Sequence, residues 1–250
     1  MQSPLQLSRR TFLATTAAAG GALLFGPGTL AQAAALVDPY RGSIPMVFAL
    51  RSGTYQTPLA DNWHAAREGQ LYAWSHRTTR THRAHDGVDV FPVAGAPLPT
   101  VYAPFAGVVA AVCFRSDNTV ASTVTYRASA TNPPAWDYSR AIDNVANLPL
   151  YGNFVWLRST ETASAGYFVL YAHLQNEAVL RALAPDQQLT TASAVGVLGD
   201  TGNAAGSPQL HVEVHYPRGS TFACTHCSPR KSGETALDPF ASLAAASARA

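Results

Sequence analysis

The sequence contains little charge. Only 13% of its 250 residues are charged, and Lys231 is the only lysine, so arginine supplies nearly all of the positive charge. Hydrophobic residues make up 47% of the chain. A chain so poor in charge and so rich in apolar side chains is not intrinsically disordered, because it has enough apolar surface to bury. Its length allows one or two domains with a sizeable core.

Long apolar segments are also missing, even at the N-terminus. Arg9 and Arg10 precede an apolar run rich in Ala and Gly, and Ala31-Gln32-Ala33 is the kind of small-residue site that signal peptidase cuts. The twin arginine resembles a twin-arginine export signal. Gly and Pro shorten the run below the roughly 18 to 20 residues that a membrane span needs. We therefore expect residues 1–33 to be a removed signal rather than a permanent membrane anchor.

Once the signal is removed, the chain lacks a surplus of positive charge. Residues 1–33 contain two of the 17 basic residues and no acid, which leaves 15 basic and 15 acidic residues. A net charge of zero gives no field for nucleic acid or anionic lipid. No later segment is long and apolar enough to cross a membrane. We expect a monomer outside the cytoplasm, in the periplasm, the cell wall or the medium.

Cysteine is scarce. Cys224 and Cys227 form a C-x-x-C pair, for which three interpretations stay open: a local disulfide, two free thiols, or half of a zinc site. An exported protein meets an oxidising compartment, which permits a disulfide. A structural zinc site needs four ligands, and no second C-x-x-C exists, so zinc is the weakest of the three. Cys113 lies in an apolar run and is predicted to be a buried thiol.

Short apolar runs separated by Gly, Pro, Asn and Asp dominate the rest of the chain. Strands are predicted within 47–50, 100–114, 153–159, 166–174, 195–199 and 210–216, and one short helix within 176–183. This pattern predicts a mainly β fold, an antiparallel sheet or sandwich with few short helices. We expect a linker at 34–45, one domain at 46–243 with an irregular insertion at about 115–150, and a frayed tail at 244–250.

Two motifs contain candidate metal-binding residues. In the run Gln209 to His215, polar and apolar side chains alternate strictly, as in a half-buried strand whose polar residues share one face. His85 and Asp89 lie four positions apart, with Gly87 between them to permit a tight path. His85, Asp89 and His211 make a three-ligand set for one Zn²⁺, which leaves a position for water as catalytic zinc sites do. The His-x-x-x-Asp pattern also occurs in CoA-dependent acyltransferases, but an exported β-rich domain has no evident supply of CoA.

The order of these motifs resembles that of the lysostaphin/LytM-like zinc metallopeptidases, a family of peptidoglycan endopeptidases. The resemblance covers roughly residues 46–241. The matching segments are Arg83–Asp89, Val101–Val109, Gly152-Asn153, Tyr171–Leu174, the glycine turn from Gly196 to Gly202, and Asp238-Pro239. The resemblance implies the duplicated antiparallel β motif of that family, one zinc ion held by His85, Asp89 and His211, and a peptide of the cell wall as substrate.

The chain departs from the family pattern at Gln209. The last motif of the family pattern is His-x-His-Phe-Glu. Its second His binds zinc and matches His211. Its first His is catalytic, and this chain has Gln209 at that position. Glutamine forms hydrogen bonds but cannot take up a proton near neutral pH. The resemblance therefore assigns proton transfer to His173, hydrogen bonding to water or the oxyanion to Gln209, and a supporting contact to Glu213.

Two functions stay open at this point. The first is an exported zinc metalloendopeptidase that hydrolyses peptidoglycan; the second is a weakened or inactive relative that binds the cell wall or activates other wall hydrolases. Asn153 is expected either to position substrate or to cap a turn, and Arg83 either to contact substrate or to brace Asp89. His215 is expected at the rim or surface. His64, His76, His82 and His226 belong to no motif and are expected at the surface.

Overall fold

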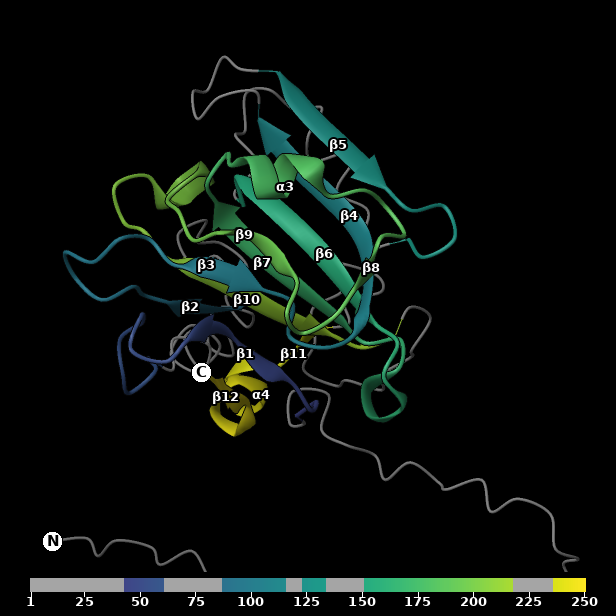
Figure 1. The fold of residues 1–250 in the computed structure, drawn as a ribbon, viewed down its shortest axis with the longest axis horizontal. Coiled ribbons are helices and arrows are strands. Elements are labelled where there is room, and N and C mark those ends of the chain that lie inside the picture. Colours follow the sequence, from purple (N-terminus) through teal and green to yellow (C-terminus); the bar gives the residue numbers. More distant parts are fainter. Residues whose placement is uncertain (1–42, 61–86, 116–122, 134–150, 218–235) are drawn as a thin grey trace, which may run out of the picture. The chain divides into compact units, whose positions relative to one another are not determined.

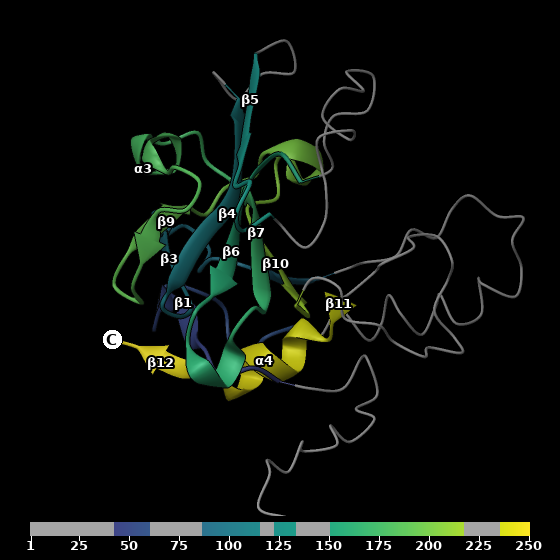
Figure 2. The same ribbon diagram turned by 90° about the vertical axis from the view of Figure 1, so that its right-hand side faces the viewer.

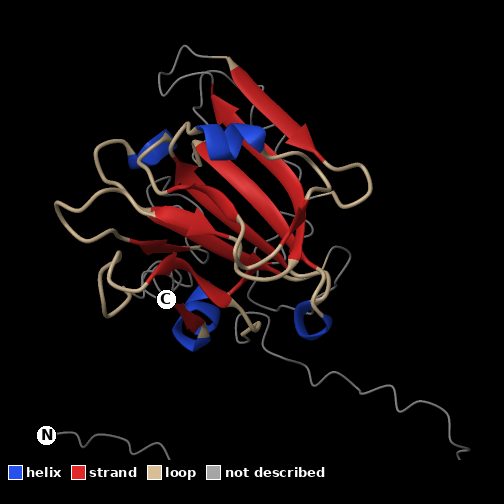
Figure 3. Cartoon of the chain, in the orientation of Figure 1, coloured by secondary structure: helices blue, strands red, loops and turns tan. Residues whose placement is uncertain are grey.

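The computed structural model describes residues 43–60, 87–115, 123–133, 151–217 and 236–250, all within one unit of the chain, Leu36–Ala250. Strands predominate (Figure 3), so the prediction of a mainly β fold with few short helices is confirmed. The helical elements are α3 (Ala178–Ala182), α4 (Pro239–Ala245) and the 3-10 turns η1 (Thr162–Ser164) and η2 (Gly202–Ala204). The strands are β1 (Val47–Arg51), β2 (Val88–Val90), β3 (Thr100–Tyr102), β4 (Gly107–Arg115), β5 (Val124–Ala128), β6 (Asn153–Ser159), β7 (Phe168–Leu174), β8 (Gln188–Leu189), β9 (Ala194–Val197), β10 (Leu210–His215), β11 (Ala236–Leu237) and β12 (Ser247–Arg249).

One antiparallel sheet of eight strands positions the site. Its order is β11-β10-β7-β6-β4-β5, and β2 and β8 pair additionally with β10 and β4. Strands β4, β6, β7 and β10 lie side by side in Figures 1 and 2 and are buried over nearly their whole length. Burial on both faces explains why most of them are near-continuous apolar runs rather than alternating ones. Two smaller sheets pair β3 with β9 and β1 with β12.

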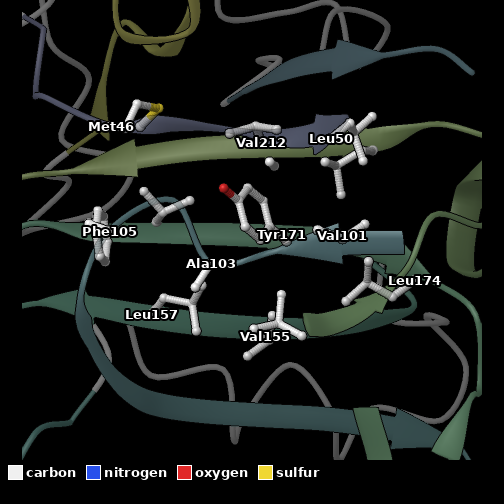
Figure 4. Packing of buried hydrophobic residues seen from close by; sticks show 14 of the residues in the cluster. Met46, Leu50, Val101, Ala103, Phe105, Val155, Leu157, Tyr171, Leu174 and Val212 are labelled. Carbon is white, nitrogen blue, oxygen red and sulfur yellow. The ribbon is translucent and has the colours of Figure 1, made fainter. Parts of the chain in front are cut away.

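The main core covers one face of this sheet. Val155, Tyr171 and Val212 are directly paired across β6, β7 and β10, so their side chains share that face. Figure 4 shows them packed with Leu50 of β1 and Val101 of β3, and the ring of Tyr171 lies in their midst. The Tyr171 hydroxyl is fully buried and has no hydrogen-bond partner among the described residues. Burial also raises the pKa of this hydroxyl far above its usual range.

Replacing Tyr171 by Phe is therefore expected to stabilise the protein. The substitution keeps the ring in the core and removes a hydroxyl that loses its water partners on folding, which is worth about 1 kcal/mol. Chemical denaturation would measure the gain, with Tyr55→Phe at a half-buried position as the control. A loss of stability in Tyr171→Phe would show that the hydroxyl has a partner in solution.

The opposite face of the sheet carries the candidate functional residues. His211, Glu213 and His215 of β10 alternate with the core residues Val212 and Val214. The same face continues across the neighbouring strands as a second, smaller apolar cluster, whose buried members are Ala110, Ala111, Cys113, Phe154, Trp156, Phe168, Leu170 and Ala172. The polar row of β10 thus lies beside an apolar surface in a sheet that is buried on both sides.

Three expectations about organisation need correction. Val124–Ala128 lies inside the stretch expected to be irregular but forms β5 along β4, and residues 100–114 form two strands, β3 and β4, rather than one. Residues 244–250 are not a frayed tail, because they contain the end of α4 and β12. The Arg249 side chain holds this end in place by donating to the carbonyl oxygens of Phe48, Ala103 and Thr191 and by packing on the Tyr102 ring.

The expectations about the other strands, the helix and Cys113 are met. The remaining predicted strands appear as β1, β6, β7, β9 and β10, and the predicted helix appears, shortened, as α3. Cys113 is buried, and burial raises the pKa of its thiol to about 12 although Arg115 opposes the shift. No helix within the described ranges is long and apolar enough to span a bilayer. The signal at 1–33 lies outside the described residues, as does most of the linker at 34–45.

Candidate metal centre

The centre of the site is the pair Asp89 and His211, which antiparallel pairing brings together. β2 pairs with β10 so that Asp89 lies directly opposite His211. Directly paired residues point to the same face of a sheet and lie close enough for their side chains to meet. The Nδ1 atom of His211 is 2.9 Å from Oδ1 of Asp89, and both side chains are largely buried, with 6% and 14% exposure. Two atoms that can each bind a metal ion therefore converge on one point.

Glu213 holds the other ring nitrogen of His211. The Nε2 atom of His211 is 3.1 Å from Oε1 of Glu213, and because a carboxylate only accepts, Nε2 carries the proton and donates it. A neutral His211 then has its lone pair on Nδ1, which faces Asp89. Carboxylates in this position fix the orientation and tautomer of metal-binding histidines. Glu213 contacts His211 in this way, and its predicted support of a metal ligand stays a prediction.

The two carboxylates make this site favour a positive charge. Burial would lower the pKa of His211, but the hydrogen bonds to Asp89 and Glu213 and their negative charges outweigh burial and raise it to about 9. Burial would likewise raise the pKa of Glu213, but the hydrogen bonds from His211 and His215 and their charge hold it far below its usual range. Without a metal, a proton on Nδ1 of His211 supplies the positive charge that a divalent cation would supply there.

Gly87 leaves room for the His211 ring. A Cβ atom at position 87 would lie 2.6 Å from Cε1 and Nε2 of His211 and 2.5 Å from the carbonyl oxygen of Val212. Real Cβ atoms do not approach other atoms so closely, and the Val212 carbonyl belongs to the backbone of β10 and cannot easily move aside. Glycine is needed here for close approach, which gives the Gly in the His-x-Gly-x-Asp pattern a specific physical role.

Gly87→Ala is expected to displace the His211 ring and weaken metal binding. We expect a loss of zinc affinity on the order of 10- to 100-fold, the usual effect of disturbing the surroundings of a ligand. Competition with a chromophoric chelator would measure it. Val88→Ala, which removes core volume at the next position without crowding the ring, is the matched control and should keep its zinc affinity. Equal affinity in Gly87→Ala and the parent would contradict this role of Gly87.

His173 lies at the end of β7 with an unusual backbone. Its φ of 61° is in the left-handed region, which residues other than glycine seldom adopt. Hydrogen bonds on both sides hold it, since its N–H donates to Tyr151 and its carbonyl accepts from Thr201 N. Its Nδ1 is 2.8 Å from the carbonyl oxygen of Thr201, an acceptor, so Nδ1 carries the proton and Nε2 carries the lone pair. This tautomer allows Nε2 to accept a proton.

Thr201 holds the His173 ring, and the sequence analysis did not single it out. Besides accepting from His173, it accepts from Asn153 N through Oγ1 and donates through Oγ1 to the carbonyl of Leu174, both at 2.9 Å. It thereby ties the end of β7 to the start of β6. Its position in the predicted glycine turn, directly before Gly202, could have drawn attention to Thr201. Its contact with His173 could not be predicted, because every residue type has a backbone carbonyl that can accept a hydrogen bond.

His173 and Gln209 lie close to the Asp89–His211 pair. The rings of His173 and His211 are 5.7 Å apart between centroids. Gln209 precedes β10, is half-buried, and donates its backbone N–H to the Gly199 carbonyl at 2.8 Å. Two positions before His211, it belongs to the same face by strand alternation. The arrangement brings the Asp89–His211 pair and a histidine that can accept a proton to one end of β7 and β10.

The structure does not bear on every predicted residue. His85, Arg83, Cys224 and Cys227 lie outside the described residues, as do His64, His76, His82 and His226, so their roles stay predictions. Asn153 is fully buried, and its Oδ1 accepts from Arg115 N at 3.0 Å. This contact ties the start of β6 to the end of β4. The two predicted roles of Asn153, positioning substrate and capping a turn, stay predictions. The predicted surface position of His215 is wrong, because its side chain is buried and bonded to Glu213.

Among the described residues, His211 and Asp89 have side chains of the kinds that bind zinc. Imidazole nitrogen and carboxylate oxygen are ordinary zinc ligands, and here both face one point with a supporting carboxylate behind the imidazole. Within the described ranges no group of three or more His, Cys, Asp or Glu side chains is arranged to hold a metal. The third ligand predicted from the sequence, His85, is not part of those ranges.

Comparison with known proteins gives similarity at the level of solved structures only. No protein-family model and no curated protein matches the chain. The catalytic domain of EnpA, a prophage-encoded M23 protein from Enterococcus faecalis, is 15% identical with a TM-score of 0.34, over 70% of this chain and 88% of that one. Csd3 of Helicobacter pylori is 16% identical with a TM-score of 0.33, over 70% of this chain and 32% of that one. A chain of the SpoIIQ–SpoIIIAH pore-forming complex is 12% identical with a TM-score of 0.38, over 70% and 85%. We therefore base the function on the site itself.

Proposed function

We propose that the chain is an exported zinc metalloendopeptidase that hydrolyses peptide bonds of peptidoglycan. The observation that carries this proposal is the convergence of Nδ1 of His211 and Oδ1 of Asp89 at 2.9 Å, beside the ring of His173. His85 would complete a set of three protein ligands for one zinc ion, the number typical of catalytic zinc sites. The motif order that resembles the lysostaphin/LytM-like peptidases supplies the substrate class.

His173 carries the proton chemistry in this proposal. Zinc, when bound, polarises a carbonyl group and lowers the pKa of water to about 7. The Thr201 carbonyl keeps the proton of His173 on Nδ1, so Nε2 accepts the proton of the attacking water and later returns it to the leaving amine. Histidine suits both steps because its ordinary pKa lies near neutral pH.

Gln209 assists without exchanging protons. Its side-chain amide donates hydrogen bonds, so it stabilises the negative oxygen that develops when water attacks the peptide carbonyl. By accepting from Nε2 of His211, Glu213 would leave the Nδ1 lone pair of that ring available to hold zinc. Arg83 is proposed to contact the substrate or to brace Asp89.

The substitution of glutamine for the first histidine of His-x-His favours a second candidate function. A chain that has lost one proton-transferring group could bind the cell wall, or activate other wall hydrolases, with little turnover of its own. His85, Asp89 and His211 match all three ligand positions of the family pattern, and this match is the reason we place the enzyme first.

Digestion of purified peptidoglycan tests the two candidates. The mature, zinc-loaded protein is expected to release fragments with new amino and carboxyl ends, detected by mass analysis, and a chelator should stop the release. Protein with His211→Gln serves as the matched control. Absence of fragments from the zinc-loaded parent, together with its co-sedimentation with peptidoglycan, would refute the enzyme and support the binding function.

The export signal is a separate prediction. Replacing Arg9 and Arg10 by Lys is expected to retain the precursor in the cytoplasm, because a receptor reads the arginine pair itself and not the charge. Fractionation of cells and immunodetection would measure the retained share. Unchanged export of the Lys-Lys precursor would instead indicate the general secretory route.

A further inference from the structure

We propose that His215 is a positioning residue for the metal-binding ring of His211 and that it acts through Glu213; this rests on the zinc site proposed above. The carboxylate of Glu213 bridges two imidazoles of the same strand. Its Oε1 is 3.1 Å from Nε2 of His211, and its Oε2 is 2.6 Å from Nε2 of His215. Asp89 of β2 and His211, Glu213 and His215 of β10 therefore form one continuous row of contacts.

Glu213 needs both partners because it is buried. Its side chain is only 1% exposed, so neither oxygen can turn to bulk water for a replacement hydrogen bond. A buried carboxylate that loses a donor carries a large desolvation cost and rotates toward whatever donor is left. Rotation about the side chain moves Oε1 as well as Oε2. The contact of His215 with Oε2 therefore fixes where Oε1 meets His211.

Packing makes His215 a rigid donor. Its side chain is 8% exposed, and its ring packs edge-on against Trp156 with centroids 4.9 Å apart. Its backbone is paired on both sides, with Phe168 of β7 and with Ala236 of β11. Because its backbone and ring are both fixed, His215 restricts the rotation of the Glu213 carboxylate. Such restriction by surrounding residues keeps a metal ligand in position.

His215 lies beyond the motif that the resemblance covers. The His-x-His-Phe-Glu pattern ends at Glu213, two residues before His215, and the sequence alone suggested a surface position for it. The motif therefore does not explain His215. This residue is linked to His211 through two hydrogen bonds, both made by Glu213.

A matched pair of variants tests the proposal. In His215→Gln the amide nitrogen takes the place of Nε2 and keeps a donor, whereas His215→Met has a similar shape but no donor. Competition with a chromophoric chelator should show zinc affinity close to the parent for Gln and weaker by about 10- to 100-fold for Met. The visible spectrum of the Co²⁺-loaded protein should change in the Met variant alone. Glu213→Gln in the Met background should add little further loss, because both changes disturb one unit.

Controls separate positioning from general stability. Val214→Ala, on the core face of the same strand, should lower stability and leave zinc affinity unchanged. Equal zinc affinity in the parent and the Met variant would overturn the role of His215 while leaving the proposed function intact, and equal weakening of the Gln and Met variants would overturn it too. A parent that binds no zinc would refute the proposed function and this inference together. His215→Phe provides the same comparison if the Met variant does not fold.

Discussion

His211→Gln is expected to reduce bound zinc from about one ion per chain to almost none. Glutamine can keep a hydrogen bond to Glu213, so the buried carboxylate retains a partner, but an amide is a poor zinc ligand compared with imidazole. His211→Ala should lose zinc as well and lose stability in addition, because it leaves Asp89 and Glu213 without the group that lies between them. Elemental analysis of the purified proteins would measure bound zinc.

The same measurement checks which residues are the ligands. His173→Asn should retain zinc, since His173 is not part of the ligand set, and it is the matched control for a change at a neighbouring histidine. Zinc that persists at the parent level in His211→Gln would refute the assignment of His211. Loss of zinc only after mutation of Cys224 and Cys227 would move the metal to the C-x-x-C pair.

The alternation of β10 was predictable because it is a local property. Polar residues at every second position of 209–215 predicted one polar face, and the structure places His211, Glu213 and His215 on the same side of the strand. The pairing of Asp89 with His211 was not predictable from local pattern. These residues are 122 positions apart, and the register between β2 and β10 depends on the whole sheet.

The errors have the same origin in long-range contacts. His215 was expected at the rim or surface because it lies farther along the strand than the motif, yet it is buried against Glu213 and the ring of Trp156. The Ala-rich end of the chain shows no periodicity that would predict a strand. It becomes β12 through parallel pairing with β1, which lies about 200 residues earlier in the chain. In both cases the decisive partner is far away in sequence.

His173→Asn is expected to lower turnover by about 10²- to 10⁴-fold while zinc stays bound. Asparagine tolerates the left-handed backbone at φ 61°, and its amide can replace the Nδ1 donor to Thr201, so the local structure should persist. What the variant lacks is the Nε2 acceptor, and Gln209 cannot replace it because an amide takes up no proton near neutral pH. Initial rates of peptidoglycan cleavage, with bound zinc measured in parallel, would show the loss. Robust zinc-dependent cleavage by His173→Asn would refute the mechanism.

Variants of Gln209 should behave differently, because glutamine contributes a hydrogen bond but no proton transfer. Gln209→Ala is expected to cost on the order of 10- to 10³-fold in turnover, the range for loss of one donor to a developing oxyanion. Gln209→His restores the second imidazole of the family pattern, so turnover should rise or its pH profile change between about pH 5 and pH 8, where a histidine titrates. The binding function predicts no turnover in the parent and unchanged cell-wall binding in His173→Asn. Cleavage by the parent and by the Gln209→Ala and Gln209→His variants, measured across this pH range, decides between the two functions. A parent as active as Gln209→His would show that glutamine fully replaces the missing histidine. An inactive parent that gains cleavage only with Gln209→His would show that the chain lost its activity at this one position.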